Sequence, residues 1–451
     1  MMHFKFKPIL CLLMVIVFLF SITACAKDGK STEESSLNEI TKVNTTEKTK
    51  EVKEVKKFSI TMPADWYRAG WQALEEHLES KKEELGVSIE IEKISDKQVL
   101  AVRFAPNQMP DFACYFGAST AITDLNGKAT IESIDGEWTK NYDLDTLKSS
   151  LYSIDGKIVG LPMDGTNLAG VLYNKKVFAD LGLKTPKNWD EFLDVCEKVK
   201  AAGKIPVYYS GRDAWTLQIP TIIGFHREVK KRSLNDIMDD INTNKLKWSD
   251  LELYKDSIAK FLYLKDAGFI NTDFLSNTYD EAQTAIAQGD AAMYIQASWV
   301  LDEINKKFPD KINDIGGFAL PFDGNDYVVG WMPGPLMMTT GCKDKERGRE
   351  FVNYLGSVEA QQVFFDAQPA IPTIKGININ LYQASKDLYS IFTTEGRGGP
   401  IFQHFTKYKY GDYAPMHQDV LIGGCTVEEM MNKMDEEFVK NAIADGNSDF
   451  K

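Results

Sequence analysis

The 451-residue chain carries 65 acidic and 52 basic side chains, which gives a formal net charge of −13. An acidic excess of this size argues against a protein that wraps phosphate backbones, so nucleic acid is excluded as the expected partner. The six cysteines form no C-x-x-C pair and lie near no histidine pair. The sequence therefore predicts no metal and no other cofactor, and it leaves open whether Cys114, Cys196, Cys342 or Cys425 form a disulfide.

The N-terminal segment has the layout of a secretory signal. Two lysines precede an apolar run from Ile9 to Phe20, which is shorter than the roughly 20 residues of a membrane-spanning helix. The run is followed by Ile22-Thr23-Ala24-Cys25, which resembles the lipobox of bacterial lipoproteins. The resemblance implies that residues 1–24 are removed and that an acylated Cys25 anchors the protein to the cell membrane. An ordinary signal peptide cut near Ala26 is the alternative.

The segment after the cysteine is expected to be a flexible linker over residues 25–57. It is poor in aromatic residues and rich in Ser, Thr, Glu and Lys, with "STEESS" as one of its clearest stretches. Such a composition cannot bury enough apolar surface to offset the entropy lost on ordering. A compact part of the chain is therefore expected to begin at Phe58.

The compact part alternates strand and helix patterns. Strand-like apolar patterns occur at residues 58–62, 87–94 and 110–116, and its length suits two lobes better than one core. The residues at helical spacing between the first two strands are Trp71, Leu74 and Leu78. This alternation predicts an α/β fold with parallel sheet covered on both faces, in which ligands lie beyond the carboxyl ends of the strands.

Two helix starts can be predicted from their capping residues. Asn188 is followed three residues later by Glu191, and Thr426 is followed in the same way by Glu429, which is the pattern of a capping box. An apolar stripe at helical spacing follows the second pair, at Val427, Met431, Met434 and Phe438. We interpret this stripe as core packing, not as a cofactor site.

One long stretch carries a family resemblance. Residues 155–192, beginning "DGKIVGLPMDGTNLAGVLYN", resemble the signature of the extracellular solute-binding proteins of ABC importers, in particular the sugar-binding family that includes maltose-binding protein. Later stretches resemble the same family in the expected order. They are residues 285–299, 351–364 and 371–376.

The resemblance implies a two-lobed periplasmic-binding-protein fold of type II, with a hinge between the lobes. Lobe one is expected to comprise residues 58–163 and 331–368, and lobe two residues 164–330 and 369–451. The three crossings between the lobes are expected near residues 164–169, 328–332 and 368–373. The implied function is non-enzymatic: a monomeric, extracytoplasmic lipoprotein binds a carbohydrate, in particular an oligosaccharide, and delivers it to ABC transporter permease subunits.

A pyranose has apolar faces and polar edges, so its site needs flat aromatic surfaces together with hydrogen-bonding groups. Trp299 is the first candidate. We expect a strand over residues 292–295, a turn over 296–298 and a helix over 300–304, which places this side chain at the mouth of the cleft. The alternative is a tryptophan buried in the core.

The resemblance places ten further candidates at the ends of elements or in loops between them. Asp65 and Trp66 directly follow the first strand, where the family often has ligand contacts. Aromatic candidates are Trp66, Tyr115, Phe116, Trp215, Trp331 and Tyr413, and polar candidates are Asp65, Asn167, Arg212 and Asp213. Each of them could equally be an ordinary surface residue.

Three other functions stay open. The same fold could bind a polyamine, a peptide or a metal, although the aromatic-rich candidate set favours carbohydrate over a cation. A receptor that feeds a sensor kinase cannot be separated from an importer component. A secreted glycoside hydrolase would need two carboxylates that flank the scissile bond, and no hydrolase motif accompanies the many acidic residues.

Overall fold

A computed structural model describes residues 54–451 except 96, 105–107, 231, 324–326 and 395–396. The predicted signal peptide, Cys25 and the linker up to residue 53 lie outside the described residues. Within the described part of the chain, no helix is both long enough and apolar enough to cross a bilayer.

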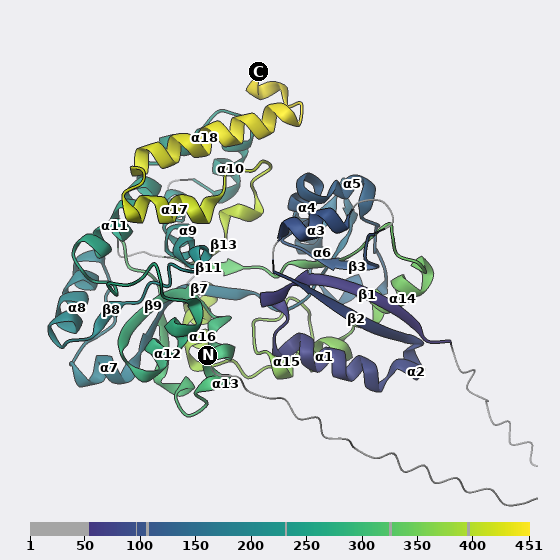
Figure 1. Cartoon of the computed structure of the whole chain (residues 1–451), viewed down its shortest axis with the longest axis horizontal. Helices are drawn as coiled ribbons and strands as arrows, with labels where there is room; N and C mark the ends of the chain where they lie inside the picture. The colour runs from purple at the N-terminus through teal and green to yellow at the C-terminus, as the bar shows by residue number, and fades with distance from the viewer. Residues whose placement is uncertain (1–53, 96, 105–107, 231, 324–326, 395–396) are drawn as a thin grey trace, which may run out of the picture. The chain divides into compact units, whose positions relative to one another are not determined.

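The first of two large sheets has the strand order β2-β1-β3-β12-β6, and Figure 1 labels β1, β2 and β3. Its strands are β1 (Lys56–Pro63), β2 (Val87–Ile94), β3 (Phe112–Cys114), β6 (Gly160–Pro162) and β12 (Pro335–Met338). β1 starts two residues before the expected Phe58. β1 is parallel to β2 and β3, as predicted, but β12 is antiparallel to β3 and β6. The predicted parallel pairing is thus present in β1, β2 and β3, and the antiparallel β12 adds to it because this strand enters the sheet on the return from the other one.

Alternate residues of the first sheet face two separate cores. On β12, Leu336 and Met338 lie in one core and Met337 in the other, as the period of a strand requires. The first core is covered by α1 (Ala69–Ser80), α14 (Lys345–Leu355) and α15 (Val358–Ala367). The second is covered by α3 (Lys97–Arg103) and α4 (Ala118–Leu125), and Ile131, which follows α5 (Gly127–Thr130), also lies in it. We call this three-layer unit lobe one.

The second sheet has the order β13-β11-β7-β9-β8, and β10 also pairs with β7. Its strands are β7 (Asn167–Asn174), β8 (Ile205–Val207), β9 (Ala291–Ala297), β10 (Ile315–Phe318), β11 (Val328–Trp331) and β13 (Gly398–Pro400). β7 is antiparallel to β9, β10 and β11. β7 and β9 are the long central strands, and all but one of their residues are buried. They therefore read as nearly continuous apolar runs.

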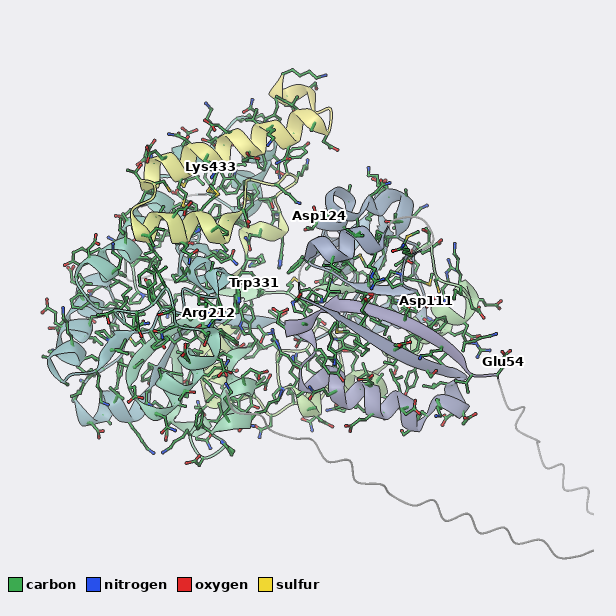
Figure 2. The ribbon with its side chains drawn as sticks, viewed as in Figure 1. Glu54, Asp111, Asp124, Arg212, Trp331 and Lys433 are labelled. Carbon is green, nitrogen blue, oxygen red and sulfur yellow. The ribbon has the colours of Figure 1, made fainter. Side chains whose placement is uncertain are left out.

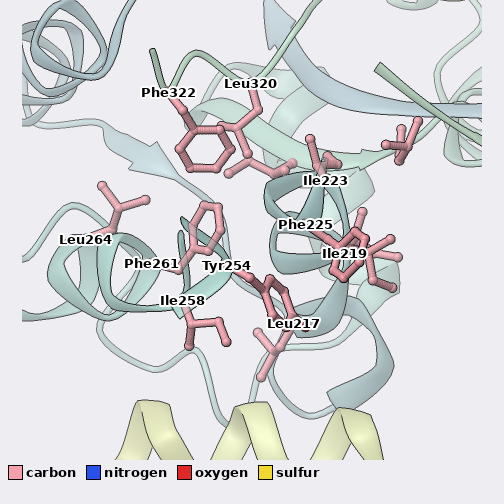
Figure 3. Close-up of a cluster of buried hydrophobic side chains, with 14 of the residues drawn as sticks. Leu217, Ile219, Ile223, Phe225, Tyr254, Ile258, Phe261, Leu264, Leu320 and Phe322 are labelled. Atoms are coloured by element: carbon pink, nitrogen blue, oxygen red, sulfur yellow. The ribbon is translucent and has the colours of Figure 1, made fainter. Parts of the chain in front are cut away.

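Helices cover both faces of the second sheet and complete lobe two. One face carries α7 (Lys175–Asp180), α8 (Trp189–Ala201), α9 (Ile219–Phe225), α10 (Leu234–Asn242), α11 (Glu252–Asp266), α17 (Tyr413–Ile422) and α18 (Val427–Ala444). The other carries α12 (Tyr279–Gln288), α13 (Val300–Lys307) and α16 (Gln383–Tyr389). Figure 3 shows part of the larger core, where Phe225 on α9 lies near Tyr254 on α11.

Both predicted helix starts are confirmed. The Asn188 side chain accepts from the backbone N–H of Glu191 at the start of α8. Thr426 and Glu429 form a complete capping box at the start of α18. Met431, Met434 and Phe438 of the predicted stripe are buried in the core of lobe two.

Short elements complete the fold. They are α2 (Lys82–Leu85), α6 (Leu144–Leu147), the hairpin of β4 (Ser153–Ile154) and β5 (Lys157–Ile158), a π-helical turn at η7 (Ser390–Thr394), and the 3-10 helices η1 (Ala64–Trp66), η2 (Glu137–Asn141), η3 (Ala214–Gln218), η4 (Glu228–Lys230), η5 (Trp248–Asp250), η6 (Ile312–Asp314), η8 (Phe402–His404) and η9 (Ser448–Phe450).

The chain passes between the lobes at residues 163–166, 332–334 and 368–382. Two details differ from the expected division. Trp331 pairs with β7 in the sheet of lobe two, whereas the sequence assigned it to lobe one. Ala370 and Ile374 pack in the core of lobe one, whereas residues from 369 onwards were assigned to lobe two. Motif matching locates a crossing only approximately, because sheet pairing and core contacts fix where each lobe ends.

Candidate functional site

Four half-buried aromatic side chains form a connected cluster on lobe two. Trp299 directly precedes α13, two residues after β9 ends. Its ring lies 5.5 Å from that of Trp331 at 81° and 6.2 Å from that of Trp215, measured between centroids. The ring of Trp215 lies in turn 5.1 Å from that of Tyr279. We call these four residues the aromatic cluster.

Trp299 is neither a fully buried nor a fully exposed side chain. β9 extends to Ala297 and thus includes part of the expected turn, so Trp299 lies closer to a strand end than the sequence suggested. Its indole Nε1 is buried and has no hydrogen-bond partner among the described residues. The ring is therefore held by packing against other aromatic rings.

Asn167 lies beside the cluster as the first residue of β7, where it is paired in register with Trp331. Its Oδ1 accepts a hydrogen bond of 3.1 Å from the Ser298 hydroxyl, and its Nδ2 donates to the Gly165 carbonyl at 3.3 Å. Ser298 precedes Trp299 in the chain. These bonds fix the amide of Asn167 next to the point where two strands of lobe two end.

Arg212 and Asp213 precede η3, the short helix that carries Trp215. The Asp213 carboxylate accepts a 2.6 Å hydrogen bond from the backbone N–H of Tyr279, so it holds the first residue of α12 beside Trp215. Arg212 is exposed, and Figure 2 labels it together with Trp331. Asp213 therefore positions the cluster, while Arg212 is free to reach solvent.

Lobe one contributes a smaller aromatic pair, Trp66 and Phe116. Trp66 ends η1, and its ring lies 5.2 Å from that of Phe116 at 76°. The indole also packs on the backbone of the second crossing, where a Cβ at Gly334 would lie only 2.2 Å from it. Phe116 is 46% exposed. Asp65 is exposed, and its carbonyl accepts from Arg68 Nε at 2.8 Å.

Two predicted stacking residues are buried instead. Tyr115 is 1% exposed and donates its hydroxyl to Asp124 at 2.7 Å. Tyr413 is 5% exposed and lies in the core of lobe two, where its hydroxyl contacts those of Tyr254 and Thr221. Burial raises the pKa of both tyrosines. This burial contradicts the expectation that their rings present a face to a ligand.

The sequence reasoning missed two residues near the candidate site, Tyr279 and Arg68. Tyr279 completes the aromatic cluster, and its only local signal is its place directly after the helix cap Thr278. Arg68 follows Trp66 by two residues. Burial raises the pKa of Tyr279, Asp164 and Asp302, and the positive charge of Arg68 opposes that rise in all three.

Asp302 lies one turn after Trp299 on α13 and is 5% exposed. Burial raises its pKa to about 8, and its Oδ1 has no hydrogen-bond partner among the described residues. Burial thus disfavours the negatively charged form of this carboxyl beside the cluster.

A chain of hydrogen bonds joins the first and third crossings. Asp164 has a positive φ of 77°, and its Oδ1 accepts from the Gly165 N–H at 2.6 Å. Its Oδ2 accepts from Gln368 Nε2 at 2.7 Å, and Gln368 Oε1 accepts from the Gly70 N–H at 3.1 Å. Burial raises the pKa of Asp164 to about 6. The start of α1 is thereby tied to both crossings.

The chemistry available at this site is stacking and hydrogen bonding. Across the described ranges, no group of three or more His, Cys, Asp or Glu side chains is arranged to hold a metal ion. Cys114, Cys196, Cys342 and Cys425 are free thiols. The two aromatic groups and the polar residues beside them would suit a ligand with apolar faces and hydroxyl edges.

A sequence model of bacterial extracellular solute-binding proteins matches residues 65–362. The multiple sugar-binding protein of Streptococcus mutans is 27% identical over 289 residues, which cover 62% of this chain and 66% of that protein. The diacetylchitobiose binding protein DasA of Streptomyces coelicolor is 26% identical over 325 residues, 69% of this chain and 72% of that protein. For relatives from Pyrococcus horikoshii and Mesorhizobium japonicum, the match spans 52% and 44% of the relative, so it falls short of two thirds of their length.

Solved structures share the fold along nearly their whole length. A chitin oligosaccharide binding protein superposes with a TM-score of 0.72 at 20% identity, over 86% of this chain and 99% of that one. The solute-binding protein RafE in complex with raffinose gives 0.68 at 21% identity, over 85% and 99%. At such identities the likeness establishes the architecture, two α/β lobes of the type II periplasmic binding-protein fold.

Proposed function

The chain belongs to the family of bacterial extracellular solute-binding proteins, and from this membership we propose that it binds a carbohydrate between its lobes and delivers it to an ABC importer. The ligand is an oligosaccharide. The protein acts outside the cytoplasm as a monomer and performs no covalent chemistry on its ligand. Residues 1–24 are a signal peptide, and Cys25 carries the lipid that keeps the protein at the membrane.

One observation carries the proposal. Trp215, Tyr279, Trp299 and Trp331 form one half-buried aromatic cluster on lobe two, and a second aromatic pair lies on lobe one. Aromatic faces pack against the apolar C–H faces of a sugar, and they keep their shape because each ring has few rotatable bonds. Arg212 is exposed and would serve the hydroxyl edges, while Asn167 is 7% exposed and bonded to Ser298 and Gly165, so it would hold the strand ends beside the cluster in place. The S. mutans and S. coelicolor relatives, both named as saccharide-binding proteins, support the same ligand class.

Binding is expected to work through the relative populations of open and closed lobes. A ligand that contacts both lobes favours the closed arrangement by the difference between its affinities for the two states. The crossings at residues 163–166 and 332–334 are the segments that would rotate. The importer then recognises the closed form and so distinguishes loaded from empty protein.

A thermal-shift screen tests the ligand class. The panel holds mono- and oligosaccharides together with polyamines and short peptides, and the protein is used without its first 24 residues. A true ligand at 100 times its dissociation constant should add about 2.7 kcal/mol to the free energy of unfolding, which gives a clear rise in melting temperature. Stabilisation by a polyamine or a peptide, with no response to any sugar, would contradict the carbohydrate proposal.

A further inference from the structure

One segment of lobe two makes direct contacts with lobe one, far along the chain from the three crossings. We call residues 401–412 the arm. Asn242 Nδ2 donates to the Phe405 carbonyl at 2.8 Å, and Asn441 Nδ2 donates to the Lys409 carbonyl at 2.9 Å. Two aromatic residues of the arm, Phe402 and Tyr410, lie in the core of lobe two. The arm is therefore held by lobe two at several points and is expected to move with it.

The arm reaches lobe one through a charge and a hydrogen bond. The ammonium of Lys409 forms an ion pair with Oδ1 of Asp124, near the C-terminal end of α4. Asp124 is labelled in Figure 2. The Ser150 hydroxyl, on the loop that precedes β4, donates to the His404 carbonyl at 2.8 Å. The Asp124 side chain is only 9% exposed and that of Lys409 is 50% exposed. The ion pair is thus better shielded from solvent than an ordinary surface pair.

The receiving surface on lobe one is connected to the aromatic pair of the candidate site. Oδ2 of Asp124 accepts the hydroxyl of Tyr115, and the next residue is Phe116, which packs on Trp66. α4 begins two residues after Phe116, and its Ser119 N–H donates to the Ser150 carbonyl at 2.9 Å. A movement of lobe one that carries Phe116 must therefore also carry both groups that the arm contacts.

From these contacts we propose that Lys409 and Asp124 are positioning residues that latch the lobes together and raise ligand affinity without touching the ligand. The proposal rests on the proposed function, because it assumes that binding accompanies closure. Separation of the lobes must break the ion pair between Lys409 and Asp124, whereas the hydrogen bond between Asp124 and Tyr115 lies within lobe one and can persist. The pair therefore stabilises the arrangement in which the lobes are in contact.

The central variant is Lys409→Met, which keeps the length and apolar stem of the side chain and removes its charge. The matched control is Lys128→Met, because Lys128 pairs with Asp155 at 3.3 Å entirely within lobe one. We expect Lys409→Met to weaken sugar binding about two- to fivefold, the range for a partly exposed ion pair, through faster dissociation. Lys128→Met should leave the affinity unchanged.

Asp124→Asn tests the other partner, since an amide oxygen can still accept the Tyr115 hydroxyl. We expect the same loss of affinity as for Lys409→Met, and no further loss in the double variant. High salt should bring the wild-type affinity down towards that of the single variants. The melting temperature of the ligand-free protein should stay close to the wild-type value. An ion pair with a purely structural role would instead lower this melting temperature and leave the dissociation rate of the sugar unchanged.

Small-angle scattering of the ligand-free proteins supplies a readout that needs no sugar. Without the latch, the lobes should separate more often, so Lys409→Met should have a larger radius of gyration than the wild type and the Lys128→Met control. Identical radii for all three proteins would overturn the latch, even if no sugar binds and the proposed function fails. Equal sugar affinities and dissociation rates for wild type and Lys409→Met would also overturn it, while the proposed function would stand.

Discussion

Trp299 is the residue on which the carbohydrate proposal depends most. Its ring contacts both Trp215 and Trp331, so it is the centre of the aromatic cluster. It follows β9 and directly precedes α13, and both elements are well packed in lobe two. The position of the ring is therefore set by the fold, which lowers the entropy lost when a ligand stacks on it.

Substitution of Trp299 by alanine should weaken sugar binding about ten- to hundredfold, because the lost apolar contact corresponds to roughly 1.5 to 3 kcal/mol. Isothermal calorimetry gives the affinity, and the melting temperature without ligand reports on folding. Tyr263→Ala is the matched control, since Tyr263 is an aromatic residue on α11 that is 50% exposed and lies outside the cluster. A large fall in ligand-free stability with unchanged affinity would make Trp299 a core residue.

For single residues, the sequence predicted which aromatic side chains lie near the ends of strands. It did not predict which of these side chains are accessible to a ligand. Trp66 and Trp299 are half-buried, whereas Tyr115 is buried although it directly follows β3. The difference comes from α4, which covers Tyr115 and gives its hydroxyl the acceptor Asp124. Tyr279 was missed because its neighbour Trp215 is remote in sequence and comes close only through the bond between Asp213 and α12.

At the scale of elements, the predicted strands and helices with a strong local sequence pattern are the ones that the structure confirms best. The strand over residues 87–94 has the predicted bounds, the strand over 58–62 is longer at both ends, and the helix that contains Trp71 is present. The antiparallel β12 was not anticipated, because nothing in its four residues indicates that the chain has just returned from the other lobe. Strand direction follows from the path of the chain and not from local composition.

The helix α18 offers a quantitative test of one such local signal. Thr426→Ala removes the oxygen that accepts the Glu429 N–H at 3.1 Å, and a lost cap of this kind costs about 1 kcal/mol. Urea unfolding should show this loss of stability, while sugar affinity should be unchanged because α18 lies outside the candidate site. Thr272→Ala is a suitable control at an exposed threonine. Equal stability of the two variants would mean that α18 does not depend on its cap.

At the scale of the whole molecule, the proposed lipid anchor at Cys25 would decide where the protein works. If Cys25 is acylated, Cys25→Ser should abolish the incorporation of a labelled fatty acid and leave the protein unlipidated. Labelling of the serine variant at the wild-type level would contradict the anchor. A second outcome separates the two signal types, because cleavage near Ala26 would give a mature N-terminus without a cysteine, which N-terminal sequencing detects.

The two short crossings have a further consequence for the motion of the lobes. Residues 163–166 and 332–334 connect strands that are paired on both sides, Pro162 with Pro335 in lobe one and Asn167 with Trp331 in lobe two. Two short crossings that are fixed at both ends prevent the lobes from sliding past each other or moving apart. Rotation of the lobes about the line that joins the two crossings is therefore the motion that costs the least free energy. A ligand that closes such a molecule has to restrict little more than the angle between the lobes. The conformational entropy lost on closure is therefore small, and most of the free energy of the ligand contacts contributes to affinity.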